Sequence, residues 1–242
     1  MNAVRYGEEI KLSGPPRNVT AIVPLDVARG TVVPISVSSN GQATIYRAVV
    51  RPLGAGTAEL RLRLPDGLPP GTYNGEATLS GRPQAVIIDI EAVSRVRTDP
   101  RQTVVTTEPA SSAPFTLTMT NTGNVPFDIP KADAIDLDDA VGQERALGRT
   151  LRAPLQAGER RVDRLFEELR EGHGGEGRVT VRTGAGRLVP GESRVLSCVI
   201  DVGDAAKSGR SYLGVWQLGN AAHVIVADIM MSERPTKSRV TR

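Results

Sequence analysis

Aromatic residues are scarce in this sequence: Phe, Trp and Tyr together make up 3% of its 242 residues. Its hydrophobic cores must therefore be built from Val, Ile, Leu and Ala. A sugar-binding cleft is disfavoured, because such clefts usually stack rings on Trp or Tyr. The single cysteine excludes an internal disulfide and a four-cysteine metal site. Two histidines are too few for most metal sites or catalytic triads.

Long apolar runs are also missing. No segment approaches the roughly 18 to 20 apolar residues that a membrane-spanning helix requires. The first residues, Met-Asn-Ala-Val-Arg-Tyr-Gly-Glu-Glu, carry no apolar signal-peptide segment. We therefore expect no membrane span. The sequence leaves the localisation unknown: a cell-envelope or extracellular location is favoured if the chain is a mature form, and a cytosolic or particle-bound location otherwise.

The sequence also has little excess positive charge: it contains 30 Lys and Arg residues and 27 Asp and Glu residues, for a net charge of +3. The arginines are scattered, and many alternate with apolar residues, as in Leu60-Arg61-Leu62-Arg63-Leu64. That alternation is typical of a strand with one solvated face. Nucleic-acid binding usually needs a clustered basic face, often with aromatic rings for stacking. We therefore predict no nucleic-acid partner.

Glycine and proline are abundant, with 25 and 17 residues, and they separate short segments rich in Val and Thr. This pattern predicts short strands joined by tight turns. The candidate strands of the first half are residues 8–12, 19–27, 32–38, 44–50, 57–64, 72–79 and 84–92. About seven short strands, spaced by roughly ten residues, are typical of an immunoglobulin-like sandwich.

The second half resumes this β pattern after a segment rich in Thr, Arg, Ser and Pro at residues 94–114. Its candidate strands begin at Phe115, before the turn Asn121-Thr122-Gly123-Asn124, and continue at 178–182, 192–202, 211–218 and 223–230. We predict an all-β protein of two tandem immunoglobulin-like antiparallel β-sandwiches. The first should span residues 1–95 and the second residues 96–232, followed by a basic, flexible tail at 233–242.

The second half departs from the β pattern between residues 129 and 175, where residues near 158–171 have helical spacing. Its apolar residues recur at i, i+3, i+4 and i+7 and form one stripe: Val162, Leu165, Phe166 and Leu169. We expect a helical insertion that ends in a flexible, glycine-rich loop at 172–177. The stripe must be buried against its own sandwich or against a partner, so it is the candidate interaction face of the chain.

An internal repeat links the two halves. When Tyr73 is placed over Tyr212, Gly75 falls on Gly214 without a gap. Leu79, Asp89 and Ile90 then fall on Leu218, Asp228 and Ile229 in the same register. The repeat predicts two copies of one closing hairpin.

The segment 68–75, Leu-Pro-Pro-Gly-Thr-Tyr-Asn-Gly, resembles the penultimate-strand motif of bacterial immunoglobulin-like and fibronectin-III-like β-sandwich modules. The Asn-Thr-Gly-Asn turn that ends the Phe115 strand resembles an early turn of envelope-associated modules of that sort. This resemblance implies a role as spacer, adhesive unit or assembly subunit. Two tandem sandwiches also resemble periplasmic pilus chaperones, although the basic anchor pair and donor-strand motif of that family are missing.

Side chains suited to chemistry are few. Cys198 shares one side of a strand with Leu196 and Ile200, which predicts a buried, inert thiol. We expect His173 to be exposed in the glycine-rich loop and His223 to begin a buried strand. The one acidic cluster is Asp133, Asp136, Asp138 and Asp139. Because the cluster lacks a calcium-loop pattern, we expect a solvated acidic turn there. A cation site is the alternative.

We therefore predict no catalytic, cofactor-binding or metal-binding residue, no cofactor, and no enzymatic activity. The leading hypothesis is a structural or assembly protein of a cell-surface, filament or particle structure. It would act through a protein partner or by self-assembly into a homo-oligomer. The first alternative is a two-domain chaperone or adaptor that binds a partner strand at a sheet edge. A carbohydrate-binding accessory protein is the second alternative.

Overall fold

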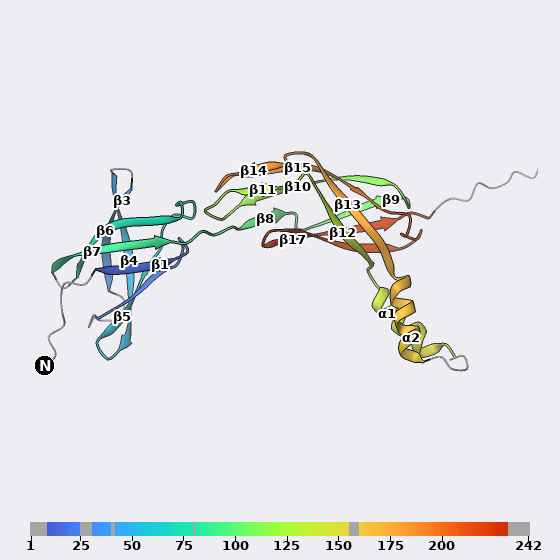
Figure 1. The fold of residues 1–242 in the computed structure, drawn as a ribbon, viewed down its shortest axis with the longest axis horizontal. Coiled ribbons are helices and arrows are strands. Elements are labelled where there is room, and N and C mark those ends of the chain that lie inside the picture. The colour runs from blue at the N-terminus through green and yellow to red at the C-terminus, as the bar shows by residue number, and fades with distance from the viewer. Residues whose placement is uncertain (1–8, 25–30, 40–41, 80, 155–159, 232–242) are drawn as a thin grey trace, which may run out of the picture. The chain divides into compact units, whose positions relative to one another are not determined.

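The computed structural model describes residues 9–24, 31–39, 42–79, 81–154 and 160–231 (Figure 1). The chain forms two compact units. Of the described residues, the first comprises those within 1–95 and the short segments 121–127 and 189–192, and the second comprises those within 96–120, 128–188 and 193–231. That the halves 1–95 and 96–232 fold independently stays a prediction, and the predicted basic tail at 233–242 lies outside the described residues.

The first unit is a small closed sandwich whose core consists of Val, Ile, Leu and Ala. Its strands are β1 (Ile10–Gly14), β2 (Val19–Val23), β3 (Val32–Ser39), β4 (Gln42–Gly54), β5 (Thr57–Leu62), β6 (Gly71–Leu79) and β7 (Arg82–Ile90). They pair in the order β1-β2-β5-β4-β3-β6-β7. With the strands lettered A to G along the chain, this order joins an A-B-E-D sheet to a C-F-G sheet, as in an immunoglobulin-like sandwich.

The second unit repeats this topology with its first strand split in two. Its strands are β8 (Val96–Asp99), β9 (Gln102–Thr107), β10 (Ser112–Asn121), β11 (Phe127–Ile129), β12 (Ala132–Asp139), β13 (His173–Thr183), β14 (Gly186–Leu188), β15 (Ser193–Asp201), β16 (Ser211–Leu218) and β17 (Ala221–Ile229). The main sheet has the order β8-β10-β15-β13-β12-β16-β17-β9, and β11 pairs with β14. The prediction of two tandem immunoglobulin-like sandwiches is confirmed.

The internal repeat is the closing hairpin of each unit. Tyr73 pairs with Ile88 in the first unit, and Tyr212 pairs with Ala227 in the second, which is the same register. Both tyrosine hydroxyls bond to backbone a few residues upstream. The Tyr73 hydroxyl donates to the Pro69 carbonyl (2.8 Å), whereas the Tyr212 hydroxyl accepts from the Lys207 amide (2.9 Å). This is the tyrosine-corner arrangement of immunoglobulin-like domains.

The helical insertion of the second unit is confirmed as α2 (Arg161–Glu171), and a second helix, α1 (Gly142–Arg152), precedes it. The expectation of a glycine-rich loop at 172–177 is wrong, because strand β13 begins at His173. Its glycines serve packing: a Cβ on Gly174 would lie 2.4 Å from Cδ1 of Tyr212, and one on Gly177 would lie 3.0 Å from the Leu137 side chain. Among the described residues, no helix is long and apolar enough to cross a membrane.

Candidate interaction surface of the second unit

Helices α1 and α2 connect β12 to β13 as an antiparallel hairpin, which we call the helical arm (Figure 1). In the first unit the strands at the equivalent place, β3 and β4, are separated by only two residues of sequence, and Ser39 pairs with Gln42. The arm is therefore inserted at the tip of one hairpin. The sandwich fold does not require it.

The base of the arm is anchored by Asp139, the last residue of β12, whose carboxylate is buried. One carboxylate oxygen accepts hydrogen bonds from Arg145 of α1 and from Arg210 (3.2 Å), and the other accepts from the Val141 amide (3.0 Å). Arg210 also reaches the Glu171 carbonyl at the end of α2 (3.4 Å). A buried carboxylate with two guanidinium partners and a backbone donor has its charge compensated, so it fixes both ends of the arm to the sheet.

Polar contacts join the two helices. Arg161 of α2 donates to the carbonyls of Thr150 (2.8 Å) and Leu151 (3.3 Å), which are acceptors that the end of α1 leaves without a helical partner. Arg149 and Glu168 form an ion pair between the helices (3.1 Å). Helix α2 has no fully buried residue. The arm is thus stabilised by its own contacts and meets the sandwich at its base.

The arm has two unlike sides. One is a polar groove lined mainly by charged residues: Glu144, Arg145, Arg149, Arg152, Arg164, Glu168 and Glu171. The exposed apolar residues form stripes at i and i+4 on α1 and at i, i+4 and i+7 on α2: Leu147, Leu151, Val162, Phe166 and Leu169. Ala146 and Thr150 are the buried residues of α1, and α1 packs chiefly against α2. Helical spacing then places both stripes on the side opposite the groove, which we call the apolar side of the arm.

Three of the four residues of the predicted interaction face lie together on the apolar side of the arm. Val162, Phe166 and Leu169 share the apolar side of the arm, and Phe166 is 67% exposed. Leu165 is half-buried. Sequence reasoning missed Leu147 and Leu151, because Gly148 and several arginines interrupt the apolar spacing of α1.

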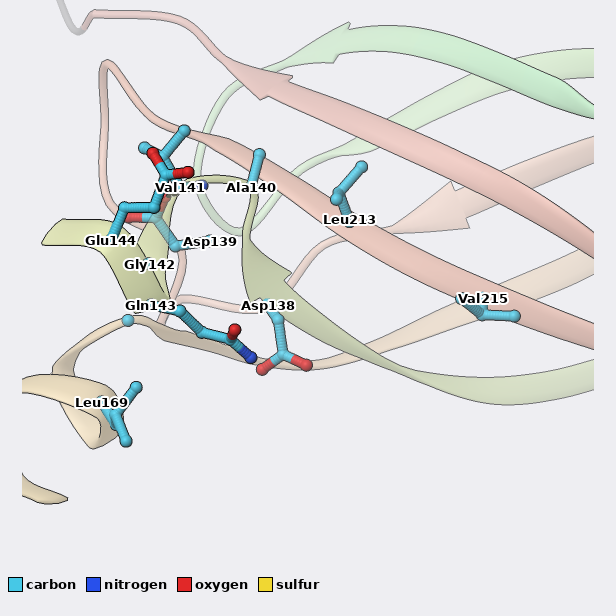
Figure 2. A pocket seen from close by; sticks show the side chains of 11 residues that line it. Asp138, Asp139, Ala140, Val141, Gly142, Gln143, Glu144, Leu169, Leu213 and Val215 are labelled. Atoms are coloured by element: carbon cyan, nitrogen blue, oxygen red, sulfur yellow. Dashed lines mark hydrogen bonds between the residues drawn. The ribbon is translucent and has the colours of Figure 1, made fainter. Parts of the chain in front are cut away.

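A hollow of about 550 Å³ lies where the arm meets the sheet (Figure 2). Its apolar lining comes from the arm and from strand β16: Val141, Leu169, Leu213 and Val215. Asp138 and Glu144 bring acidic groups to the same hollow. Figure 2 shows Leu213 and Val215 on one strand and Asp138 on the strand that pairs with it. The hollow thus joins the apolar side of the arm to the outer surface of the sheet.

The outer surface of that sheet is apolar where a sandwich is expected to be polar. Strand register places Leu213, Val226 and Val104 in one row, and Val215 and Val224 in the next. We call these five residues the sheet face. Val104 is 58% exposed and Val215 is 53% exposed. Sequence reasoning missed this face because β17 is an almost continuous apolar run, in which outward and inward residues look alike.

Acidic residues border the sheet face along β12 and β13. Asp138 pairs with Leu213 of the sheet face, and Asp136 pairs with Glu176. We call Asp136, Asp138 and Glu176 the acidic margin; all three are exposed. His173 lies beside it, with Nδ1 3.2 Å from the Asp138 carboxylate. The prediction of an acidic turn at 133–139 is wrong, because these residues form strand β12 and Asp139 is an ion-paired anchor.

The remaining candidate residues lie in the core of the second unit or at its surface. Cys198 is buried, as predicted, and burial raises the pKa of its thiol to about 11. His223 is buried as well, stacks on Phe115 and places Nε2 3.1 Å from the Thr103 hydroxyl. His173 is exposed, as predicted, but it begins a strand. Within the described ranges, no three His, Cys, Asp or Glu side chains are grouped closely enough to hold a metal ion.

Sheet edges, which the chaperone alternative would use, are short in the described part of the chain. In the first unit β7 pairs with β1 and closes the strand order. In the second unit the terminal strands are β8 and β9, with 4 and 6 residues. Such short edges offer few backbone groups to an added strand.

No protein-family model matches this sequence, and no protein of curated function is similar enough to indicate a role. Among solved structures, the chain is similar to the titin fragment A168–A169, with 12% identity over 93% of this chain and 97% of that one and a TM-score of 0.33. It is also similar to the titin I-band fragment I67–I69, with 10% identity over 92% and 63% of the two chains and a TM-score of 0.36. The Yersinia pseudotuberculosis adhesin InvE matches with 10% identity over 91% and 56% and a TM-score of 0.23. Because these identities and TM-scores are low, the immunoglobulin-like fold is identified from the strand pairing and not from the similarity to these structures.

Proposed function

We propose that this chain is a non-enzymatic structural or assembly protein of a cell-surface, filament or particle structure, and that it acts through protein–protein contacts made by the helical arm. The observation that carries this proposal is the apolar side of the arm. Leu151 and Phe166 are 60% and 67% exposed, on a structure that the sandwich does not need. Covering them would stabilise a complex by about 1–2 kcal/mol each, given about 1.5–3 kcal/mol for full burial of such side chains.

The placement of the reactive side chains supports a non-enzymatic role. Cys198, the single cysteine, and His223, one of the two histidines, are both fully enclosed in the core of the second unit. A thiol with a pKa of about 11 holds almost no thiolate at neutral pH. These two residues serve packing.

Site-specific photo-crosslinking tests the proposal. A benzophenone amino acid replaces Phe166 in one variant and Val195 in a control variant, in the cells that naturally produce the protein. Val195 is 64% exposed, close to the 67% of Phe166, but lies on β15, away from the arm. We expect adducts of higher mass from position 166 and none from position 195. Equal adducts from both positions, or none from either, would contradict the proposal.

A further inference from the structure

The internal repeat provides a natural control for the sheet face. Leu213 and Val215 of β16 correspond to Asn74 and Glu76 of β6, since Tyr212 corresponds to Tyr73. Both first-unit residues are exposed and polar. The same fold, in the same register, therefore accepts polar residues at these positions.

A third position shows the same difference. Val104 pairs with Val226 in the second unit, and the equivalent parallel pair of the first unit is Lys11 with Ile87. Lys11 is exposed, as expected for a solvated sheet surface. Apolar residues at all three places in the second unit are therefore not a requirement of the fold. They indicate a surface that is covered in use.

We propose that the sheet face and the hollow of one copy receive the helical arm of a second copy. This inference rests on the proposed function and names the partner of the arm. Both surfaces are apolar, and their charges are opposite: the sheet face has an acidic margin, and the end of the arm is rich in arginine. In the sequence, residues 152–164 hold four arginines, Arg152, Arg160, Arg161 and Arg164, against two acidic residues, Glu159 and Asp163.

The pairing of charges sets the direction of the contact. Asp136, Asp138 and Glu176 form the acidic margin, and Glu144 adds a carboxylate to the hollow. The net positive end of an incoming arm would be attracted to this margin while Phe166 and Leu151 cover Leu213 and Val215. Opposite charges at the border of an apolar contact favour one orientation and speed the encounter of the partners. Two unlike surfaces in contact form a heterologous interface, which builds a chain of copies unless the rotation closes it.

Two variants separate the surfaces. The face variant carries Leu213→Asn and Val215→Glu, the residues that the first unit has at these positions. The arm variant carries Leu151→Ser and Phe166→Ser. Val195→Glu serves as the control, since it removes a comparably exposed apolar residue elsewhere on the second unit. Thermal melts followed by circular dichroism establish that each variant is folded before association is measured.

Sedimentation velocity over a range of concentrations gives the answer. We expect the wild-type chain and the Val195→Glu variant to associate with rising concentration, and each of the other two variants to stay monomeric alone. Mixing the face variant with the arm variant should restore a complex of two copies, because one intact arm then meets one intact face. A monomeric wild-type chain, association of either variant alone, or a mixture without a complex would overturn the inference. If the inference is overturned in this way but position 166 crosslinks to a different protein, the proposed function still holds and only the identity of the partner is wrong.

Discussion

Gly174 lies against the ring of Tyr212 so closely that a Cβ at this glycine would be 2.4 Å from Cδ1 and 2.5 Å from Cε1 of the tyrosine. Tyr212 is fully buried, and its hydroxyl is held by the Lys207 amide, so the ring cannot easily move aside. The glycine-rich start of β13 is therefore a packing requirement of the tyrosine corner.

Gly174→Ala should lower the free energy of unfolding by about 1–3 kcal/mol, the usual cost of overpacking a core. Gly148→Ala is the control, because Gly148 lies inside α1 and a Cβ at this glycine would meet no heavy atom within 4 Å. That change should instead stabilise the protein by about 0.5–1 kcal/mol. Urea unfolding of both variants checks the pair. Equal effects would mean that the Tyr212 contact does not constrain Gly174.

Asp139→Asn should destabilise the second unit by about 3 kcal/mol, because it leaves Arg145 and Arg210 without their shared counter-charge at a buried site. Asp163→Asn, which breaks the exposed pair with Arg160, should change stability by about 0–1 kcal/mol. Thermal unfolding measures both variants. A neutral Asp139→Asn substitution would contradict the role of Asp139 as the anchor of the arm.

Stability should fall as the pH is lowered toward and below 6.5, partly because of His223. Burial lowers the pKa of His223 from its ordinary value of 6.5. The unfolded chain therefore takes up this proton at a higher pH than the folded protein, so the free energy of unfolding rises with pH across that interval. Unfolding free energies measured between about pH 5 and 8 should show a smaller slope in His223→Gln than in the wild type. An unchanged slope would assign the pH dependence to other groups.

The Cys198 thiol should not react with Ellman's reagent at pH 8 while the protein is folded. Burial raises its pKa to about 11, and the side chain is fully enclosed between the strands of the second unit. One thiol per chain should react after denaturation, since the sequence contains a single cysteine. Rapid, complete labelling of the native protein would show that this part of the sheet opens readily.

Much of the fold could be predicted from local pattern. Strands such as Thr57–Leu62 alternate apolar and polar residues with a period of two, and glycine and proline mark the turns between them. The closing hairpins can be predicted from Tyr73 and Tyr212 because the same residues recur in the same register. Helix α2 can be predicted because its apolar residues follow a helical period.

The rest depended on information that a single sequence does not carry. Strand β12 ends in acidic residues. Asp139 at its end pairs with Arg210, a tertiary contact between residues that are far apart in the sequence. The local pattern predicts a loop at Gly174, although this residue lies in strand β13. The glycine is needed because the Tyr212 ring lies against it, and that tertiary contact is not visible in the local sequence. The outward position of Val226 became visible only when the register of β17 with its neighbours was known.

The helical arm is a docking surface if its apolar side chains can be removed without loss of stability. The double variant Leu151→Ser, Phe166→Ser should unfold within about 1 kcal/mol of the wild type, because both side chains are mainly exposed. Leu137→Ala, in the fully buried core of the same unit, should by comparison lose about 2–5 kcal/mol. Sedimentation velocity on the same samples should show that the double variant has lost association while Val195→Glu keeps it. A double variant that loses stability as Leu137→Ala does, or that still associates like the wild type, would contradict the role of the arm as a docking surface.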